Sequence, residues 1–244
     1  MSSVWGKIGG AGIGFALGGP IGALLGALAG HFLIDSSGGL FSPPPRDVIF
    51  TTGLIALAAK MAKADGVVLQ SEVDAFRTIV DVPPEEQPKV DRLFRLAQST
   101  TDGFESYARQ LAETFPDEPA LLENVLDGLF HIAKADNAIH EAELNYLATV
   151  ARIFGFSDAE FNRIRSRHVL LDDDPYLALG LNREMSDEDM KRAYHWLVAE
   201  NHPDRQIALG LPPEAIRIST ERLAAINAAW ERIVTERQNK PSGD

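Results

Sequence analysis

A thirteen-residue segment occurs twice in this chain, and it constrains the fold more than any other feature. The first copy reads MAKADGVVLQSEV at residues 61–73, and the second reads IAKADNAIHEAEL at residues 132–144. The two copies align without gaps. Each ends one helix at Ala-Lys-Ala-Asp and turns at Gly66 or Asn137, because Gly and Asn tolerate the left-handed backbone found at helix ends. The repeat therefore predicts two similar helix–loop–helix units.

The chain around the repeat continues the helical pattern from residue 48 to residue 170. Apolar residues recur three and four positions apart, as in Leu122, Val125 and Leu129, which is the spacing of one helix face. Strand signals, namely β-branched alternation with hairpin turns, are absent from the sequence. We therefore predict an all-α fold in which residues 48–170 form a compact helical bundle.

Acidic residues recur at matching positions of the two repeat copies. They are Asp65 and Glu72 in the first copy, and Asp136 and Glu143 in the second. If the two units pack together, four carboxylates could meet and bind a divalent metal ion through oxygen ligands. The alternative is that the carboxylates only cap loop and helix-start amides. Capping is the preferred interpretation, metal binding stays open, and no other cofactor is indicated.

The amino-terminal segment from Ile8 to Gly30 contains no charged residue. As a helix it would be about 34 Å long, enough for a bilayer core of roughly 30 Å. A cleaved signal peptide is the competing interpretation, but its amino-terminal region would hold only Lys7 and its apolar stretch would be unusually long. We expect a transmembrane anchor over residues 1–35, followed by a Ser-, Gly- and Pro-rich linker over residues 36–47.

Glycine occurs at every fourth position of this span. Four residues turn a helix by about 400°, so these glycines form one slowly winding stripe. Such a stripe lets two helix backbones approach closely in lipid, which predicts a homodimer; the alternative is a weak tether that does not self-associate. The dimerisation stripe comprises Gly10, Gly14, Gly18, Gly22, Gly26 and Gly30.

Composition excludes several functions. The net charge of -12 argues against nucleic acid as a partner, because proteins that bind phosphate backbones are usually basic. The chain has no cysteine, which excludes disulfides, thiolate zinc sites and cysteine nucleophiles. No nucleophile–base pairing, phosphate loop or HExxH motif is present. We therefore expect a protein that is not an enzyme.

The C-terminal quarter, residues 171–238, predicts an antiparallel pair of helices, with residues 239–244 as a tail. Ser186 caps the first long helix, which runs to about Asn201. The tripeptide His202-Pro203-Asp204 follows, then a polar loop, and Pro213 near the start of a second long helix. The two helices are therefore joined by a connection that carries this tripeptide.

This quarter resembles a J-domain. The resemblance rests on DPYLALGL, MKRAYHWL, the HPD tripeptide and LAAINAAW, which occur in the order and spacing of that family. It implies that this region contacts a DnaK-type heat-shock chaperone and triggers the partner's ATP hydrolysis, with no chemistry by the J-domain itself. The chaperone-binding residues that it implies are His202, Pro203, Asp204, Lys191, Arg192, Tyr194 and Arg205. The helix before the tripeptide usually carries a basic face in this family. Here that face has few basic residues, because His195, Trp196 and Glu200 occupy positions where basic residues are frequent.

The middle domain resembles TerB-like domains, through the paired ADGxxxxxE and ADNxxxxxE units. The order of anchor, TerB-like domain and C-terminal J-domain resembles the DjlA type of membrane-anchored co-chaperones. This resemblance implies a regulatory co-chaperone of the bacterial inner membrane, with a short periplasmic amino terminus and cytoplasmic domains. The alternative is a metal-binding TerB-like sensor or scaffold with an accessory J-domain.

Overall fold

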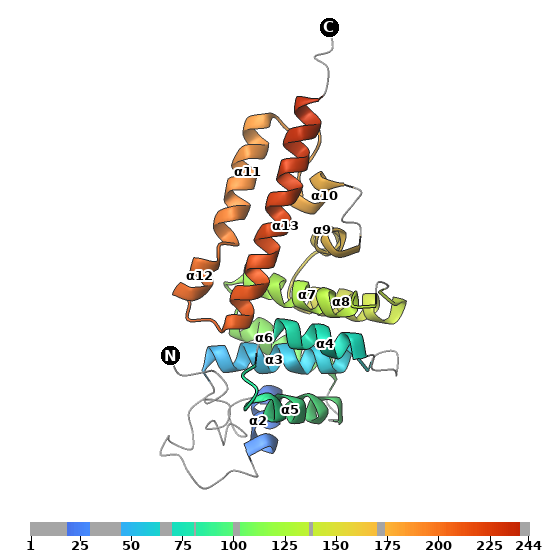
Figure 1. The fold of residues 1–244 in the computed structure, drawn as a ribbon, viewed down its shortest axis with the longest axis vertical. Coiled ribbons are helices and arrows are strands. Elements are labelled where there is room, and N and C mark those ends of the chain that lie inside the picture. Colours follow the sequence, from blue (N-terminus) through green and yellow to red (C-terminus); the bar gives the residue numbers. More distant parts are fainter. Residues whose placement is uncertain are drawn as a thin grey trace.

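The structure is a computed structural model of the chain. It describes residues 19–29, 45–63, 70–80, 82–99, 103–136, 139–169 and 174–239. Within these ranges every regular element is a helix, so the all-α prediction is confirmed. Figure 1 shows the helices of the middle domain stacked in layers, with α11 and α13 standing side by side beyond them.

The helices before residue 170 form a bundle around α3 and α7. They are α2 (Gly19–Ala29), α3 (Arg46–Met61), α4 (Gln70–Ile79), α5 (Gln87–Ser99), α6 (Phe104–Thr114), α7 (Pro119–Ala133), α8 (Glu141–Ile153) and α9 (Asp158–Val169). Nearly every residue of α3 is buried, because it packs against α5, α6 and α7. At Gly53 the absence of a side chain lets Leu111 of α6 approach closely.

The repeat forms the two predicted helix pairs. The first copy ends α3 and leads into α4, and the second ends α7 and leads into α8. Both central helices are buried over most of their length and lie in one hydrophobic core, which includes Leu54, Leu57, Leu126 and Leu129. Residues 64–69 and 137–138, which join the helices of each pair, lie outside the described residues.

Part of the predicted membrane span packs against the bundle. Helix α2 contacts α3, α5 and α6, and it buries Ile21, Leu24 and Leu25. The backbone N–H of Ile21 donates to Gln110 Oε1 at 2.8 Å. In the part of the chain that the structure describes, no helix is long and apolar enough to span a bilayer. Four stripe glycines (Gly10, Gly14, Gly18 and Gly30) lie outside the described residues.

The C-terminal region contains α10 (Pro175–Leu179), α11 (Asp187–Glu200), α12 (Pro203–Ala208) and α13 (Pro213–Gln238). The Ser186 hydroxyl caps α11 by accepting the N–H of Asp189 at 3.1 Å, as expected. A small apolar core joins α10, α11 and the second half of α13. The polar loop expected after the HPD tripeptide is in part a helix, since residues 203–208 form α12. Pro203 favours this helix because its fixed φ suits the first helical position.

Candidate functional site

The HPD tripeptide lies at an exposed corner between α11 and α12. His202 is the N-cap of α12, and its Nδ1 accepts the backbone N–H of Asp204 at 3.2 Å. Because Nδ1 accepts this bond, the neutral ring carries its hydrogen on Nε2. The side chains of His202 and Asp204 are 48% and 82% exposed. The corner therefore presents a ring N–H donor and a carboxylate acceptor to the solvent from a fixed backbone.

The corner is fastened to α11 on both sides of the tripeptide. Arg205, which follows it, donates to Glu200 Oε1 at 2.6 Å. Asn201, which precedes it, is buried and donates from its side-chain amide to the Leu197 carbonyl at 2.7 Å. These bonds and the ring of Pro203 hold the loop in one conformation, so little conformational entropy would be lost if a partner bound there.

The other chaperone-binding residues that the J-domain resemblance implies lie partly on the surface and partly in the core. Lys191 and Arg192 lie exposed on α11, and Arg192 forms an ion pair with Asp189. Tyr194 is half-buried instead: its ring stacks on Trp230 with centroids 4.6 Å apart, and its hydroxyl donates to Asn227 Oδ1 at 3.1 Å. The structure thus gives Tyr194 a part in packing α11 on α13.

Helix α13 belongs to two cores at once. Its second half packs with α10 and α11, whereas Ala215 and Ile218 in its first half, and Leu211 just before it, join the core of the middle bundle. Gly128 of α7 makes room for this contact, because a Cβ there would meet Ile218 Cδ1 at 3.0 Å. Asn124 of α7 donates to the Ser219 hydroxyl at 2.7 Å. Helix α13 therefore connects the helices that carry the HPD corner directly to the bundle.

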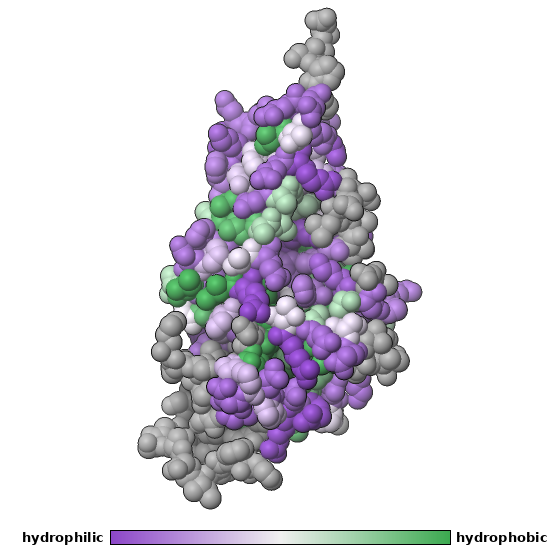
Figure 2. Space-filling model, viewed as in Figure 1, coloured by the Kyte–Doolittle hydropathy of each residue, from purple (hydrophilic) through white to green (hydrophobic). Residues whose placement is uncertain are grey.

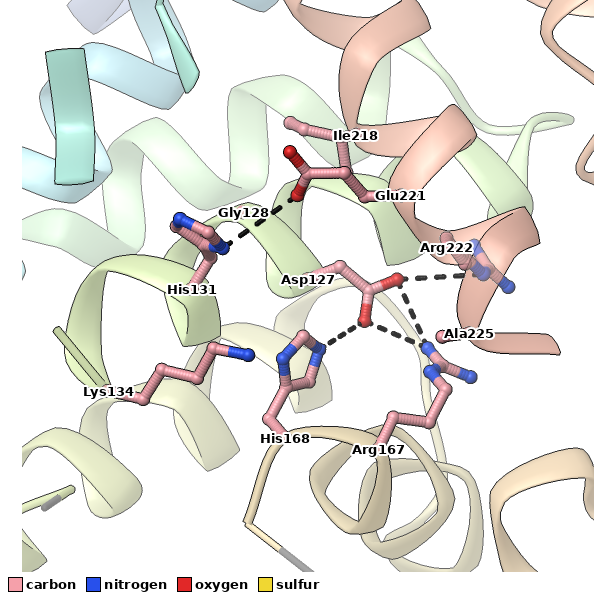
Figure 3. Close-up of a pocket in the computed structure, with 10 residues that line it drawn as sticks. All are labelled: Asp127, Gly128, His131, Lys134, Arg167, His168, Ile218, Glu221, Arg222 and Ala225. Carbon is pink, nitrogen blue, oxygen red and sulfur yellow. Dashed lines mark hydrogen bonds and ion pairs between the residues drawn. The ribbon is translucent and has the colours of Figure 1, made fainter. Parts of the chain in front are cut away.

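A buried group of charges reinforces this junction, and Figure 3 draws its members other than Glu123. Arg222 of α13 lies 2.6 Å from Glu123 and 3.5 Å from Asp127, both on α7. Arg167 of α9 reaches the same two carboxylates at 2.7 and 2.9 Å. His168 Nε2 lies 2.7 Å from Asp127 Oδ1, and its ring stacks on Phe130. We call Glu123, Asp127, Arg167, His168 and Arg222 the junction cluster.

The junction cluster keeps its carboxylates charged although they are buried. Burial alone would raise the pKa of Glu123, but the guanidinium groups of Arg222 and Arg167 lower it to about 2. Burial also opposes ionisation of Asp127, but Arg167 and the bond from His168 hold its pKa far below the usual value. Sequence reasoning missed this cluster, since no motif connects three helices that lie far apart in the chain.

A small hollow opens beside the junction cluster (Figure 3). It has a volume of about 100 Å³, and Lys134 and His131 line it together with Asp127, Arg167, His168 and Arg222. A space of that size suits a few water molecules. We therefore regard the junction cluster as a structural connection between the bundle and the C-terminal helices.

The acidic repeat positions come together in one pair. Glu143 is buried, it accepts the backbone N–H of His140 at 2.8 Å, and its carboxyl is hydrogen-bonded to Glu72 of the other repeat copy. Asp136 lies 3.6 Å from His140 Nε2, and Asp65 lies outside the described residues. Among the described residues no group of three or more His, Asp and Glu side chains is arranged to hold a metal ion.

The Glu72–Glu143 pair should make the bundle sensitive to pH. Burial, and then the charge of Glu72, raise the pKa of Glu143 to about 7. Because the folded pKa lies above the unfolded value, the shared proton stabilises the fold at low pH, and this contribution is lost as the pH rises through about 7. Glu143→Gln imitates the protonated form of this carboxyl. It should stabilise the protein at pH 8 by about 1–2 kcal/mol, which is less than the full pKa shift would give because solvent screens the charges.

Thermal unfolding of the full chain in detergent between pH 5 and pH 8 measures this effect. The wild-type midpoint should fall across this window, and that of Glu143→Gln should fall less. Glu141→Gln is the matched control, because Glu141 occupies an exposed position in the first turn of the same helix. Equal slopes for wild type and Glu143→Gln would contradict the prediction.

Comparisons with known proteins match two parts of the chain to family models. Residues 51–166 match the family described as tellurite resistance protein TerB. Residues 1–41 match the transmembrane domain of the co-chaperone DjlA, which supports a membrane anchor at the amino terminus. The two matches cover the anchor and the bundle that the sequence predicts.

Relatives that match most of the chain are also described as co-chaperone DjlA. A co-chaperone protein DjlA from Coxiella burnetii is 27% identical over 93% of this chain and 96% of its own length. One from Photobacterium profundum is 29% identical over 96% of this chain and 99% of its own length. A third, from Shewanella oneidensis, is 28% identical over 79% of each chain. No solved structure matches the chain.

Proposed function

Because the chain is a DjlA-type protein with a TerB-like domain, we propose that it recruits a DnaK-type chaperone to the membrane and stimulates its ATPase. The observation that carries the proposal is the exposed and rigid corner formed by His202, Pro203 and Asp204. A ring N–H and a carboxylate in a fixed arrangement suit a partner that offers matching acceptors and cations. The protein would act on the partner's conformation and perform no chemistry itself.

ATP hydrolysis by a purified bacterial DnaK-type chaperone tests this function. The full chain, reconstituted into lipid nanodiscs, should raise the single-turnover rate several-fold over the rate with empty nanodiscs. Unchanged hydrolysis at saturating protein would contradict the proposed function.

We further propose the bacterial inner membrane as the location, with a single span, a short periplasmic amino terminus and cytoplasmic domains. The family match over residues 1–41 supports the anchor. The cytoplasmic side follows from the proposed ATP-dependent partner. Protease added to intact spheroplasts should leave the C-terminal helices uncut, and their digestion would contradict this orientation.

We also propose that the glycine stripe forms a homodimer within the membrane. Gly18→Leu with Gly22→Leu should abolish the signal of a membrane two-hybrid assay, because bulky side chains keep two helix backbones apart. Ala16→Leu with Ala23→Leu is the control, since these small residues belong to the same span but lie off the stripe. Retention of the signal in the glycine variant would argue against the dimer.

A metal-dependent sensor is the second candidate function, and the contact between Glu72 and Glu143 favours it. A divalent ion could replace the proton that these carboxylates share. The unfolding measurements at pH 8 would be repeated with calcium, magnesium, zinc and manganese at millimolar concentration. A rise in midpoint that Glu143→Gln abolishes would support the sensor, and unchanged midpoints would remove it.

A further inference from the structure

Large hydrophobic side chains are exposed near the HPD corner. Among the described residues, the exposed large hydrophobic side chains are Leu177, Trp196, Ile207 and Leu209. Three of these four lie within six residues of the tripeptide, on both sides of it. Single exposed hydrophobic residues are ordinary on protein surfaces, but their concentration around one functional corner indicates a binding surface.

Trp196 lies on the surface of α11 that leads to the corner. It is 63% exposed. It follows Arg192 by four residues and precedes Glu200 by four, so the three side chains share one helix face. Glu200 in turn accepts a hydrogen bond from Arg205, directly after the tripeptide. A partner that covers the HPD corner and this face of α11 would therefore cover the indole of Trp196.

The charges on this face are partly neutralised within the protein. Arg192 pairs with Asp189, and Arg205 pairs with Glu200. Each pair reduces the net positive charge that the face presents, and long-range attraction scales with net complementary charge. Ionic steering of an acidic partner is therefore weak here, and binding needs another source of free energy.

Helix α12 supplies a second apolar group. It turns Gln206 inward, where that side chain is buried, and leaves Ile207 57% exposed. Ile207 lies one helical turn after Pro203, so it follows the tripeptide in the chain, whereas Trp196 precedes it. Figure 2 shows hydrophobic surface over α12, at the edge of the molecule. The HPD corner thus has an exposed apolar side chain before it and another after it.

We propose that Trp196 and Ile207 form an apolar contact with the DnaK-type chaperone, one on each side of the HPD corner. This inference rests on the proposed function and specifies how the partner is held. The chaperone is the occupant because the two side chains flank the corner that it would cover. Apolar burial supplies the affinity that the paired arginines do not, and the HPD residues trigger hydrolysis once the partner is bound.

The expected effect is on the concentration dependence of stimulation. Burying one large apolar side chain contributes roughly 1.5–3 kcal/mol, and every 1.4 kcal/mol changes an equilibrium constant about tenfold. Trp196→Ala and Ile207→Ser should each raise the concentration needed for half-maximal stimulation about tenfold. The maximal rate should stay at the wild-type value, because the HPD residues are intact.

The test uses the full chain in nanodiscs, the DnaK-type ATPase and the double variant Trp196→Ala/Ile207→Ser. Leu177→Ala is the matched control: this leucine is also exposed, but it lies on α10, and Figure 1 shows α13 between α10 and α11. Thermal midpoints of all variants check the fold. Titrations at about 0.05 M and about 0.5 M salt add a second readout, since salt screens ionic contacts and spares apolar ones.

The proposal is supported if the double variant needs a much higher concentration at both salt values, with its midpoint and maximal rate unchanged and Leu177→Ala like wild type. The proposal is overturned if the double variant reaches half-maximal stimulation at the same concentration as wild type, provided that His202→Gln is inactive. The proposal is also overturned if the double variant needs a higher concentration but has lost a dimer that wild type shows in sedimentation. The same holds if Leu177→Ala needs an equally raised concentration. If wild type does not stimulate at all, the proposed function fails and this contact fails with it.

Discussion

His202→Gln is expected to reduce stimulation of the chaperone ATPase to the basal rate, even at saturating concentration. The imidazole of His202 presents a ring N–H at the exposed corner while its Nδ1 caps α12. Glutamine is a flexible amide in place of a rigid ring, so the arrangement of donor and carboxylate at the corner is lost. The fold should persist, because losing this exposed cap costs about 1 kcal/mol.

The matched control for this variant is His195→Gln. His195 is also an exposed histidine of the same helical hairpin, but it lies on α11 before the tripeptide. Single-turnover hydrolysis with each variant in nanodiscs, together with thermal unfolding, separates loss of triggering from loss of fold. His202→Gln with wild-type stimulation would contradict the proposed role of the tripeptide. Equal loss in both variants would assign the effect to the hairpin as a whole.

The parts of the fold that the sequence predicts are those set by local signals. The Ala-Lys-Ala-Asp repeat locates the ends of α3 and α7, and the capping residue Ser186 locates the start of α11. Helix periodicity identifies the apolar side of each helix, because burial follows the 3.6-residue period. Ile226 and Ile233 of α13, seven residues apart, follow this period, and both lie in the C-terminal core.

The junction between bundle and hairpin could not be predicted in this way. Arg222 and Glu123 are far apart in sequence, and a charged residue on an amphipathic helix is usually solvated. Only the packing of α13 across α7 turns these side chains into buried partners. The exposure of Ile207 was missed for a related reason, since a short segment called polar by composition folded into α12 and turned its glutamine inward.

Arg222→Ala is expected to destabilise the protein by about 3–5 kcal/mol, the usual cost of removing one partner from a buried ion pair. Glu123 and Asp127 would keep Arg167 but lose a contact at 2.6 Å and another at 3.5 Å. For a chain of this size the thermal midpoint should fall by roughly 10 °C. Arg232→Ala, at an exposed arginine of the same helix, should change stability by less than about 1 kcal/mol, because interactions of exposed charges contribute little.

The pH dependence of this loss distinguishes the lost charge from lost packing. In wild type the pKa of Glu123 is depressed to about 2, so its contribution to stability is present above about pH 4.5 and disappears as the pH falls toward 2. Without Arg222 that pKa should rise toward the unfolded value, so less stability should be lost between about pH 4.5 and pH 2 than in wild type. Arg222→Met with Glu123→Gln should recover part of the stability, because the side chain at position 123, which loses the closer contact with Arg222, is then uncharged. If Arg222→Ala were as stable as wild type and had the same acid transition, α13 would be held to the bundle by its apolar contacts alone.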